Sequence, residues 1–455
     1  MSELTYNYSD TRWEHQRPES NLLPGLALLA MIASVINCAL PEIEMLLTGG
    51  NVPIPQGIIK IGCFGFIVFL MVLYGKLDLY LFPRAIWLMM VLYLAAVFPF
   101  LWFAQSKEPS EIFLAYNAYY CPLIFAPAVT AIRGKLSERA AMRIFLSIFA
   151  VCALLGWVQF IVQDPIVKLA SNDGNFRIFA SQWMQGGDRS VRAMSFFAFA
   201  QEYGSFLVLV AATGIGMCMK RGGWKIGIPI FLIATASCYT TMTRATFIQL
   251  FIATVAALTF TFGRKPTRMR WQPLIALGFG IYIAFSGVSS VLSEKKSLAD
   301  DSSLQQRLMQ WGMWVSDLQH SSASQQLFGL GFCSADRPAM IPRKEGWALD
   351  QALVDNLYLG ITLHIGLIGA VLVLALLWGM WRFVRIEAIS RPTPLMIGIA
   401  SFWSTFLFVG MFNIQAANYG FWFLTAVIIA RRSSDIDHAA LRDSPMEGEL
   451  NPGMA

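Results

Sequence analysis

The sequence predicts an all-α membrane protein, a polytopic bundle of about twelve transmembrane helices with a long, partly helical loop between the ninth and tenth spans. The first observation is composition. Of the 455 residues, 56% are hydrophobic and only 14% are charged, which is more apolar material than one soluble core can bury. The second observation is that apolar residues form repeated runs near the roughly 20 residues that a helix needs to cross a bilayer. The runs are continuous rather than alternating, so they do not fit the strands of an outer-membrane barrel.

Each predicted span is a helix, because a backbone in hydrocarbon must pair its polar groups within the segment. The apolar runs are 22–40, 54–75, 85–104, 112–132, 144–163, 195–219, 226–242, 245–262, 273–292, 354–381, 393–413 and 417–430. Together they define a membrane domain over residues 22–430. The polar tail 1–21 lacks a signal-peptide pattern, so the first run is expected to stay as a signal anchor, and the tail 431–455 has a composition typical of disorder.

Positive charge fixes the predicted orientation, because Lys and Arg are retained on the cytoplasmic side of a membrane. With the N-terminus inside, every predicted inner segment is basic, and the short outer loops PEIEMLLTGG and QSKEPSE are acidic or nearly neutral. The inner basic residues are Arg12, Arg17, Lys76, Arg84, Arg133, Lys135, Arg139, Arg143, Lys220, Arg221, Lys225, Arg264, Lys265, Arg268, Arg270, Arg382, Arg385, Arg391, Arg431 and Arg432. Both termini are therefore predicted to be cytoplasmic. The net charge of +6 follows from this pattern and does not indicate a nucleic-acid partner.

Two predicted outer segments are long, residues 164–194 and 293–353, and long loops often carry function. The second contains SLQQRLMQWGMWVSDLQH, in which apolar residues recur at helical spacing. These residues are Leu304, Leu308, Trp311 and Val315. The spacing predicts an amphipathic helix on the outer membrane surface. Six of the seven cysteines lie in apolar runs, and only Cys333 lies in this loop, so neither a disulfide framework nor a metal site is predicted.

Arg244 stands out among the charged residues of the predicted outer side. The segment TTMTRATF leaves almost no loop between two apolar runs, so the guanidinium must sit at or just below the outer interface, where it requires an anionic partner. One candidate partner is Glu202 in FAFAQEYGSF. The other is a phosphate-bearing ligand, which the planar fork of arginine donors suits. The residues alone leave both interpretations open.

The segment TMTRATFIQLFIATVA resembles the T-x-[ST]-R-[GA] span of the O-antigen ligase and Wzy-type polymerase superfamily. Three further segments agree with this resemblance. RAMSFFAFAQEYGSFLVL is similar to the family's Arg-led entry into the next span, and RLMQWGMWVSDLQHSSASQQLFGLGF to its R-x-x-x-W segment ending in G-x-G. VDNLYLGITLHIGLIGAVLVLALL is similar to its [HD]-N-x-Y-L span. The four segments cover about residues 190–380 in the family's order.

The resemblance implies a glycosyltransferase of the bacterial inner membrane with its active site in the periplasm. Such enzymes transfer glycan from an undecaprenyl-diphosphate carrier to an acceptor hydroxyl, without metal or other cofactor. The implied partners are the lipid-linked glycan donor, the glycan acceptor, the bilayer and, in the pathway, a chain-length regulator or a flippase. Nucleic acid is not among them.

The same resemblance implies roles for individual residues. Arg192 and Arg244 would stabilise the negative charge that develops on the leaving diphosphate. Arg307 would contact the lipid diphosphate or the glycan, although an arginine on a surface helix can also simply snorkel to water. Asp355, the residue before the asparagine of the fourth segment, would be the general base. Its alternative roles are counter-ion to Arg244 or helix N-cap.

Asn356 would orient the sugar or the base, Tyr358 would line the cavity, and Glu202 would lie beside them as the partner of Arg244. Family ligases that act on lipid A core are expected to have His where this chain has Asp355, which favours a polymerase. His320 and His364 remain alternative bases, with solvated and helix-packing roles as their simpler interpretations.

A second departure is Met194-Ser195, where the family often has a Ser-Gly pair close after the first arginine. A ligase that transfers glycan to lipid A core or to protein is the alternative within the enzyme class. A secondary transporter or lipid-glycan exporter is the alternative outside it. Against transport, the two halves show no repeat and no matching pair of Gly/Pro-broken spans, and the outer cations cluster at the interface.

Overall fold

A computed structural model describes about two fifths of the chain. The described residues are 65–66, 69–70, 72–73, 138–163, 169–170, 176–177, 182–185, 188–195, 197, 200–219, 222–262, 311–312, 315–316, 318–329, 357–390 and 392–409. The two tails and the predicted spans 22–40, 85–104, 112–132, 273–292 and 417–430 lie outside them. The residues described between 65 and 73 are helical, as expected for the predicted span 54–75.

Six helices coincide with predicted spans. They are α6 (Glu138–Val162), α7 (Ala200–Met217), α8 (Trp224–Thr240), α9 (Arg244–Phe262), α13 (Leu357–Ser390) and α14 (Pro394–Val409). Three helical stretches within them are long and apolar enough to cross a membrane, namely Met142–Val162, Arg244–Thr261 and Ile365–Ser390, and α8 is a shorter apolar helix. The helical character predicted for these runs is therefore confirmed, and three of them have the properties of spans.

The predicted loop 164–194 contains two short antiparallel hairpins. Strand β1 (Leu169–Ala170) pairs with β2 (Phe176–Arg177), and β3 (Gln182–Gln185) pairs with β4 (Asp188–Val191). The sequence did not predict them, because strands of two to four residues are too short to show an alternating pattern. The second long segment contributes the short helix α12 (Ala323–Phe328) and the helical residues Trp311 and Val315 of the predicted amphipathic helix.

Many large apolar side chains of the described helices are exposed, and several polar side chains are buried within an apolar core. On α6 the exposed residues Val151, Leu154, Val158 and Ile161 form one stripe at helical spacing. The buried polar residues include Gln159, Thr213, Thr235, Ser237, Thr240, Thr246, Gln249, Ser401 and Thr405. Large exposed apolar surfaces of this kind are rare in proteins that are surrounded by water. The arrangement supports a membrane protein, in which polar side chains pair between helices.

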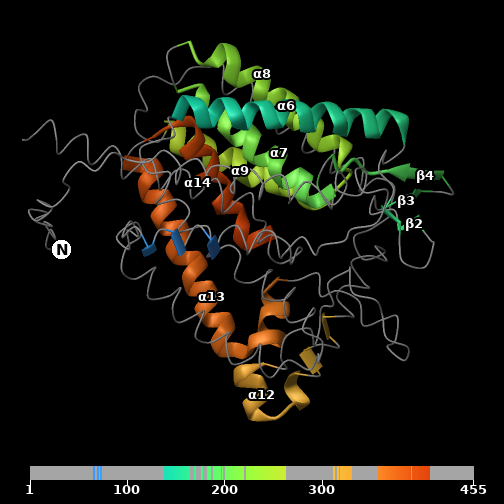
Figure 1. Cartoon of the computed structure of the whole chain (residues 1–455), viewed down its shortest axis with the longest axis vertical. Helices are drawn as coiled ribbons and strands as arrows, with labels where there is room; N and C mark the ends of the chain where they lie inside the picture. The colour runs from blue at the N-terminus through green and yellow to red at the C-terminus, as the bar shows by residue number, and fades with distance from the viewer. Residues whose placement is uncertain are drawn as a thin grey trace, which may run out of the picture.

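Helix α7 is the centre of the described bundle, and α8, α9 and α14 pack around it, with α6 across α8 (Figure 1). Glycines allow the close crossings. A Cβ at Gly214 would lie 2.8 Å from the carbonyl oxygen of Gly227 on α8, and one at Gly216 would lie 2.7 Å from that of Pro394 on α14. Small residues at such crossings let the helix backbones approach closely. Helices in a membrane associate through this close packing, because lipid is as apolar as the helix surface and no hydrophobic force drives them together.

Replacing Gly227 with Ala is expected to destabilise the contact between α7 and α8. The new methyl would overlap the carbonyl oxygen of Gly214 and approach Cys218 Sγ to 2.9 Å, and backbone on either side cannot move as a side chain can. Overpacking of this kind costs about 1–3 kcal/mol. Thermal unfolding in detergent should show a lower midpoint for Gly227→Ala. The neighbouring Ile226→Ala variant, which alters an exposed residue, should unfold close to the unaltered chain; equal midpoints for all three would contradict this prediction.

Helix α13 is bent near its start. Gly366 has φ 71° and ψ −176°, a conformation inside the helix that is not helical. The long part after the bend continues to Ser390. Arg382 and Arg385 were predicted to lie in a loop, but they lie within this helix. The short part before Gly366 lies at the lower end of α13 in Figure 1, next to α12. The main neighbours of α13 among the described elements are α12 and α14.

Candidate functional site

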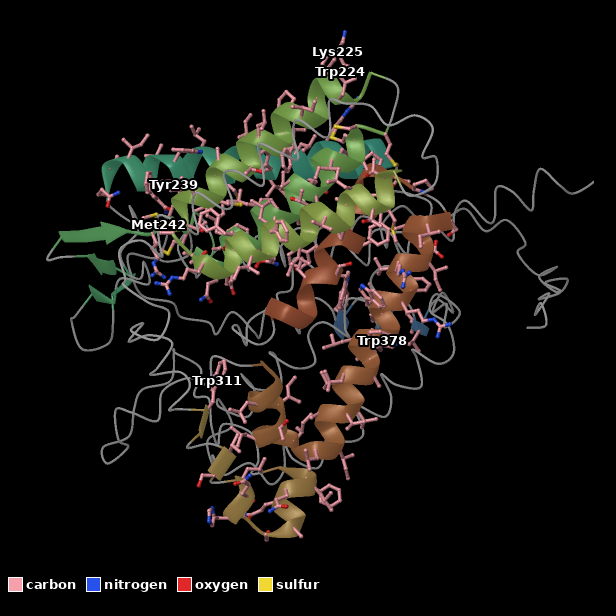
Figure 2. All side chains as sticks on the ribbon, turned by 180° about the vertical axis from the view of Figure 1, so that it is seen from behind. Trp224, Lys225, Tyr239, Met242, Trp311 and Trp378 are labelled. Carbon is pink, nitrogen blue, oxygen red and sulfur yellow. The ribbon has the colours of Figure 1, made fainter. Side chains whose placement is uncertain are left out.

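One end of the bundle collects the ends of α6 and α8 and the beginnings of α7 and α9; we refer to it as the Arg244 end. In Figure 2, Tyr239 and Met242 lie at this end beside the strand hairpins, and Trp224 and Lys225 lie at the opposite end of α8. The elements alternate in direction, so the segments that precede α7 and α9 in the sequence meet in space.

Arg192 lies in the segment that joins strand β4 to helix α7. Its side chain is half-buried, and the three residues that follow it, Ala193, Met194 and Ser195, are at most 1% exposed. The Ala193 N–H donates a hydrogen bond of 3.0 Å to the carbonyl oxygen of Thr240 at the end of α8. Thr240 is four residues before Arg244 in the sequence. The structure thus brings the backbone segments of Arg192 and Arg244 together.

Gln159 of α6 binds the same segment from the other side. Its side chain is fully buried; its Oε1 accepts hydrogen bonds from Met194 N (3.0 Å) and Ser195 N (2.7 Å), and its Nε2 donates to the Ser195 carbonyl oxygen (3.0 Å). Ser195 has φ +54°, the left-handed region that residues with a side chain seldom adopt. Three bonds from one amide compensate for the cost of this conformation.

Arg244 begins α9 after a tight turn that consists of Thr241, Met242 and Thr243. Met242 in this turn has φ +50°, and the hydroxyls of Thr241, Thr243 and Thr246 form a chain of hydrogen bonds of 2.9 and 2.5 Å. The three threonines are at most 4% exposed, so the chain satisfies groups that are otherwise costly to bury. The half-buried Arg244 is therefore carried by a fixed turn rather than by a long loop.

Glu202 lies in the first turn of α7 and is half-buried. The close approach of α7 to α9 occurs at Gly204, where a Cβ would overlap the Thr246 hydroxyl. Farther along, Ser205 Oγ donates to Gln249 Oε1 (3.1 Å), and Gln249 Nε2 donates to Thr405 Oγ1 of α14 (3.2 Å). The first turns of α7 and α9 are thus adjacent, and Glu202 and Arg244 lie at the same end of the bundle.

The electrostatic character of this end follows from its geometry. Two helices begin here and two end here, so the partial positive charge of the helix starts is largely offset by the partial negative charge of the helix ends. Arg192 and Arg244 add two full positive charges, and Glu202 adds one negative charge. Such an arrangement can bind an anion such as a phosphate group, and it can stabilise negative charge that develops during a reaction.

Arg307, Asp355 and Asn356 lie outside the described residues. Tyr358 is in the first turn of α13, before the bend at Gly366, and its side chain lies outside the described part. His364 is in the same short stretch of backbone. His320 is exposed, and its Nδ1 lies 2.7 Å from the Ser316 carbonyl oxygen of its own helical segment, in line with a solvated role.

Gln159 and the threonines of the α8–α9 turn were not predicted as part of the site. A glutamine in the middle of an apolar run is the signal that could have revealed Gln159, since a buried amide in a membrane helix needs partners. The identity of its partner, a loop more than thirty residues ahead, depends on tertiary packing.

No protein-family model matches this chain, and no curated protein sequence matches it either.

Proposed function

We propose that this chain is a membrane glycosyltransferase that joins undecaprenyl-diphosphate-linked oligosaccharide repeat units, as Wzy-type O-antigen and exopolysaccharide polymerases do. The four segments that resemble this superfamily motivate the proposal. The observation that carries it is the 3.0 Å bond between Ala193 N and Thr240 O, because it joins the segments of Arg192 and Arg244, two arginines that the resemblance assigns to one reaction.

The proposed reaction transfers a glycan between two oxygens. The acceptor hydroxyl attacks the anomeric carbon of the donor, the bond from that carbon to the diphosphate oxygen breaks, and the diphosphate leaves with the electron pair. Arg192 and Arg244 stabilise its negative charge. Asp355 accepts the proton of the hydroxyl. No change of oxidation state occurs, so the reaction needs neither a reductant nor an oxidant.

The other predicted residues have supporting roles in the proposal. Arg307 contacts the lipid diphosphate or the glycan, Asn356 orients the sugar or Asp355, and Tyr358 lines the cavity. Glu202 sits beside Arg244 and limits the net positive charge of the site. In the pathway, a flippase would supply the lipid-linked glycan, or a chain-length regulator would control the length of the polymer.

The proposed location is the bacterial inner membrane, with both termini in the cytoplasm and the Arg244 end in the periplasm. The described helices fit this orientation. Lys225 lies in the first turn of α8, at the end opposite Arg244 (Figure 2). Arg143 lies near the start of α6, whose other end is at the Arg244 end. Cytoplasmic retention of positive charge would then place the Arg244 end outside.

Reconstitution tests the proposal directly. The purified protein is placed in liposomes that contain undecaprenyl-diphosphate-linked oligosaccharide extracted from cells that express the chain. Polymerase activity gives a ladder of longer lipid-linked glycans. A ligase gives glycan on added lipid A core or protein and no ladder, and a transporter moves the lipid-linked glycan across the bilayer without a new glycosidic bond. Either of the last two results would replace the polymerase assignment.

A further inference from the structure

We propose that Gln159 is a positioning residue that holds the Arg192 segment in the conformation needed to bind a lipid diphosphate. This inference rests on the proposed function, since it gives Arg192 a diphosphate to bind. It adds a residue in the last turn of the membrane helix α6 that the resemblance does not include.

The first argument is the number and direction of the contacts. Gln159 makes three hydrogen bonds of 2.7 to 3.0 Å to the backbone of Met194 and Ser195. A primary amide carries the same donor and acceptor groups as a peptide bond, so Gln159 pairs with this backbone as a neighbouring strand would. The contacts fix the backbone two and three residues after Arg192.

The second argument is the conformation that these contacts maintain. Ser195 has φ +54°, which costs of order 1 kcal/mol for a residue with a side chain. Without the Gln159 amide, Ser195 would lower its free energy by returning to a conformation with negative φ. The backbone of the residues before it would then change direction. The bond from Ala193 N to Thr240 O fixes one point of the segment, and Gln159 fixes the next two. Arg192 therefore has a defined backbone direction relative to α8.

The third argument is burial. Gln159, Met194 and Ser195 are 0 to 1% exposed, so no solvent competes for these bonds or replaces them when they are lost. Removing the amide leaves two buried N–H groups and a carbonyl oxygen without their partner, which forces the segment to rearrange. Trp157, two residues earlier on α6, makes a different contact, from its Nε1 to Ser237 Oγ on α8 at 3.0 Å. This bond joins α6 to α8 and does not involve the Arg192 segment.

Hydrogen exchange on the full-length protein in nanodiscs tests the contact itself, with fragmentation that resolves single amides. In Gln159→Leu the amides of Met194 and Ser195 should exchange faster, on the order of tenfold, because their acceptor is gone. In Trp157→Phe they should exchange as in the unaltered chain. If Gln159→Leu does not fold, Gln159→Asn replaces it, since it keeps a buried amide but is one methylene too short to make the same three bonds. Unchanged exchange in a folded Gln159 variant would overturn the inference.

Binding of undecaprenyl diphosphate, measured as radiolabelled lipid retained by the protein in nanodiscs, tests the role. Gln159→Leu should weaken binding on the order of tenfold in the unaltered chain and less than about twofold in an Arg192→Gln background, because residues that act through one another are not additive. Equal weakening in both backgrounds, or none in the first, would overturn the inference, as would an unaltered chain that binds no lipid diphosphate. If the lipid binds with the expected coupling but no glycan ladder forms, the polymerase proposal fails and the positioning role of Gln159 stands.

Discussion

Replacing Arg244 with Ala is expected to lower the rate of glycan polymer formation by a factor on the order of 10² to 10³, the loss found when one preorganised donor to a developing negative charge is removed. Arg244 is half-buried at the first position of α9. The hydrogen-bonded hydroxyls of Thr241, Thr243 and Thr246 hold the backbone on both sides of Arg244, so its side chain starts from a fixed position. The measurement is the initial rate of ladder formation in liposomes.

Two variants make this test specific. Arg244→Lys keeps the charge but loses the planar fork of donors, and should retain part of the rate. Arg143→Ala removes an exposed arginine near the start of α6, at the opposite end of the bundle, and should keep the full rate. Each variant is first checked for insertion and for its thermal unfolding midpoint. A folded Arg244→Ala protein that polymerises at the normal rate would exclude Arg244 from the mechanism.

The positions of the described membrane helices could be predicted from the sequence because hydrocarbon leaves the backbone few alternatives. At the beginning of α9 the prediction was accurate to one residue, because the predicted run starts at 245 and the helix starts at Arg244. The end of α13 shows the limit. Arg382 and Arg385 were predicted to lie in a loop because they are charged, yet the helix continues through them to Ser390. Charge marks where a span leaves the membrane, and a helix can extend beyond that point.

The candidate site was predictable only in part. Arg244 was recognised because an arginine between two apolar runs is costly and needs a reason. The contact between the Arg192 segment and the Arg244 end could not be derived from the spacing of residues in the sequence. It depends on one backbone hydrogen bond, between Ala193 before α7 and Thr240 at the end of α8. Gln159 was missed for the same reason. The left-handed conformation of Ser195 was not predicted either, because a serine gives no sign of a positive φ.

The bend of α13 at Gly366 gives a second large expected effect. Its φ of 71° and ψ of −176° lie in a region that is essentially restricted to glycine. A Cβ there would also overlap the carbonyl group of Leu327 and the N–H of Phe328 at the end of α12. Strain and overlap each cost about 1–3 kcal/mol. Gly366→Ala is therefore expected to lower the thermal unfolding midpoint and to separate α12 from α13.

Hydrogen exchange can locate this effect. In Gly366→Ala, the amides of α12 and of residues 357–365 should exchange faster, whereas those of α7 and α9, which pack elsewhere in the bundle, should not change. Gly312→Ala is the matched control, because a Cβ at Gly312 would meet nothing within 4 Å. Residues 357–365 follow directly on Asp355 and Asn356, so the variant should also lose polymer formation if these residues act in the reaction. Faster exchange together with a normal rate would show that α12 and the bend support the fold alone, and would remove the start of α13 from the proposed site.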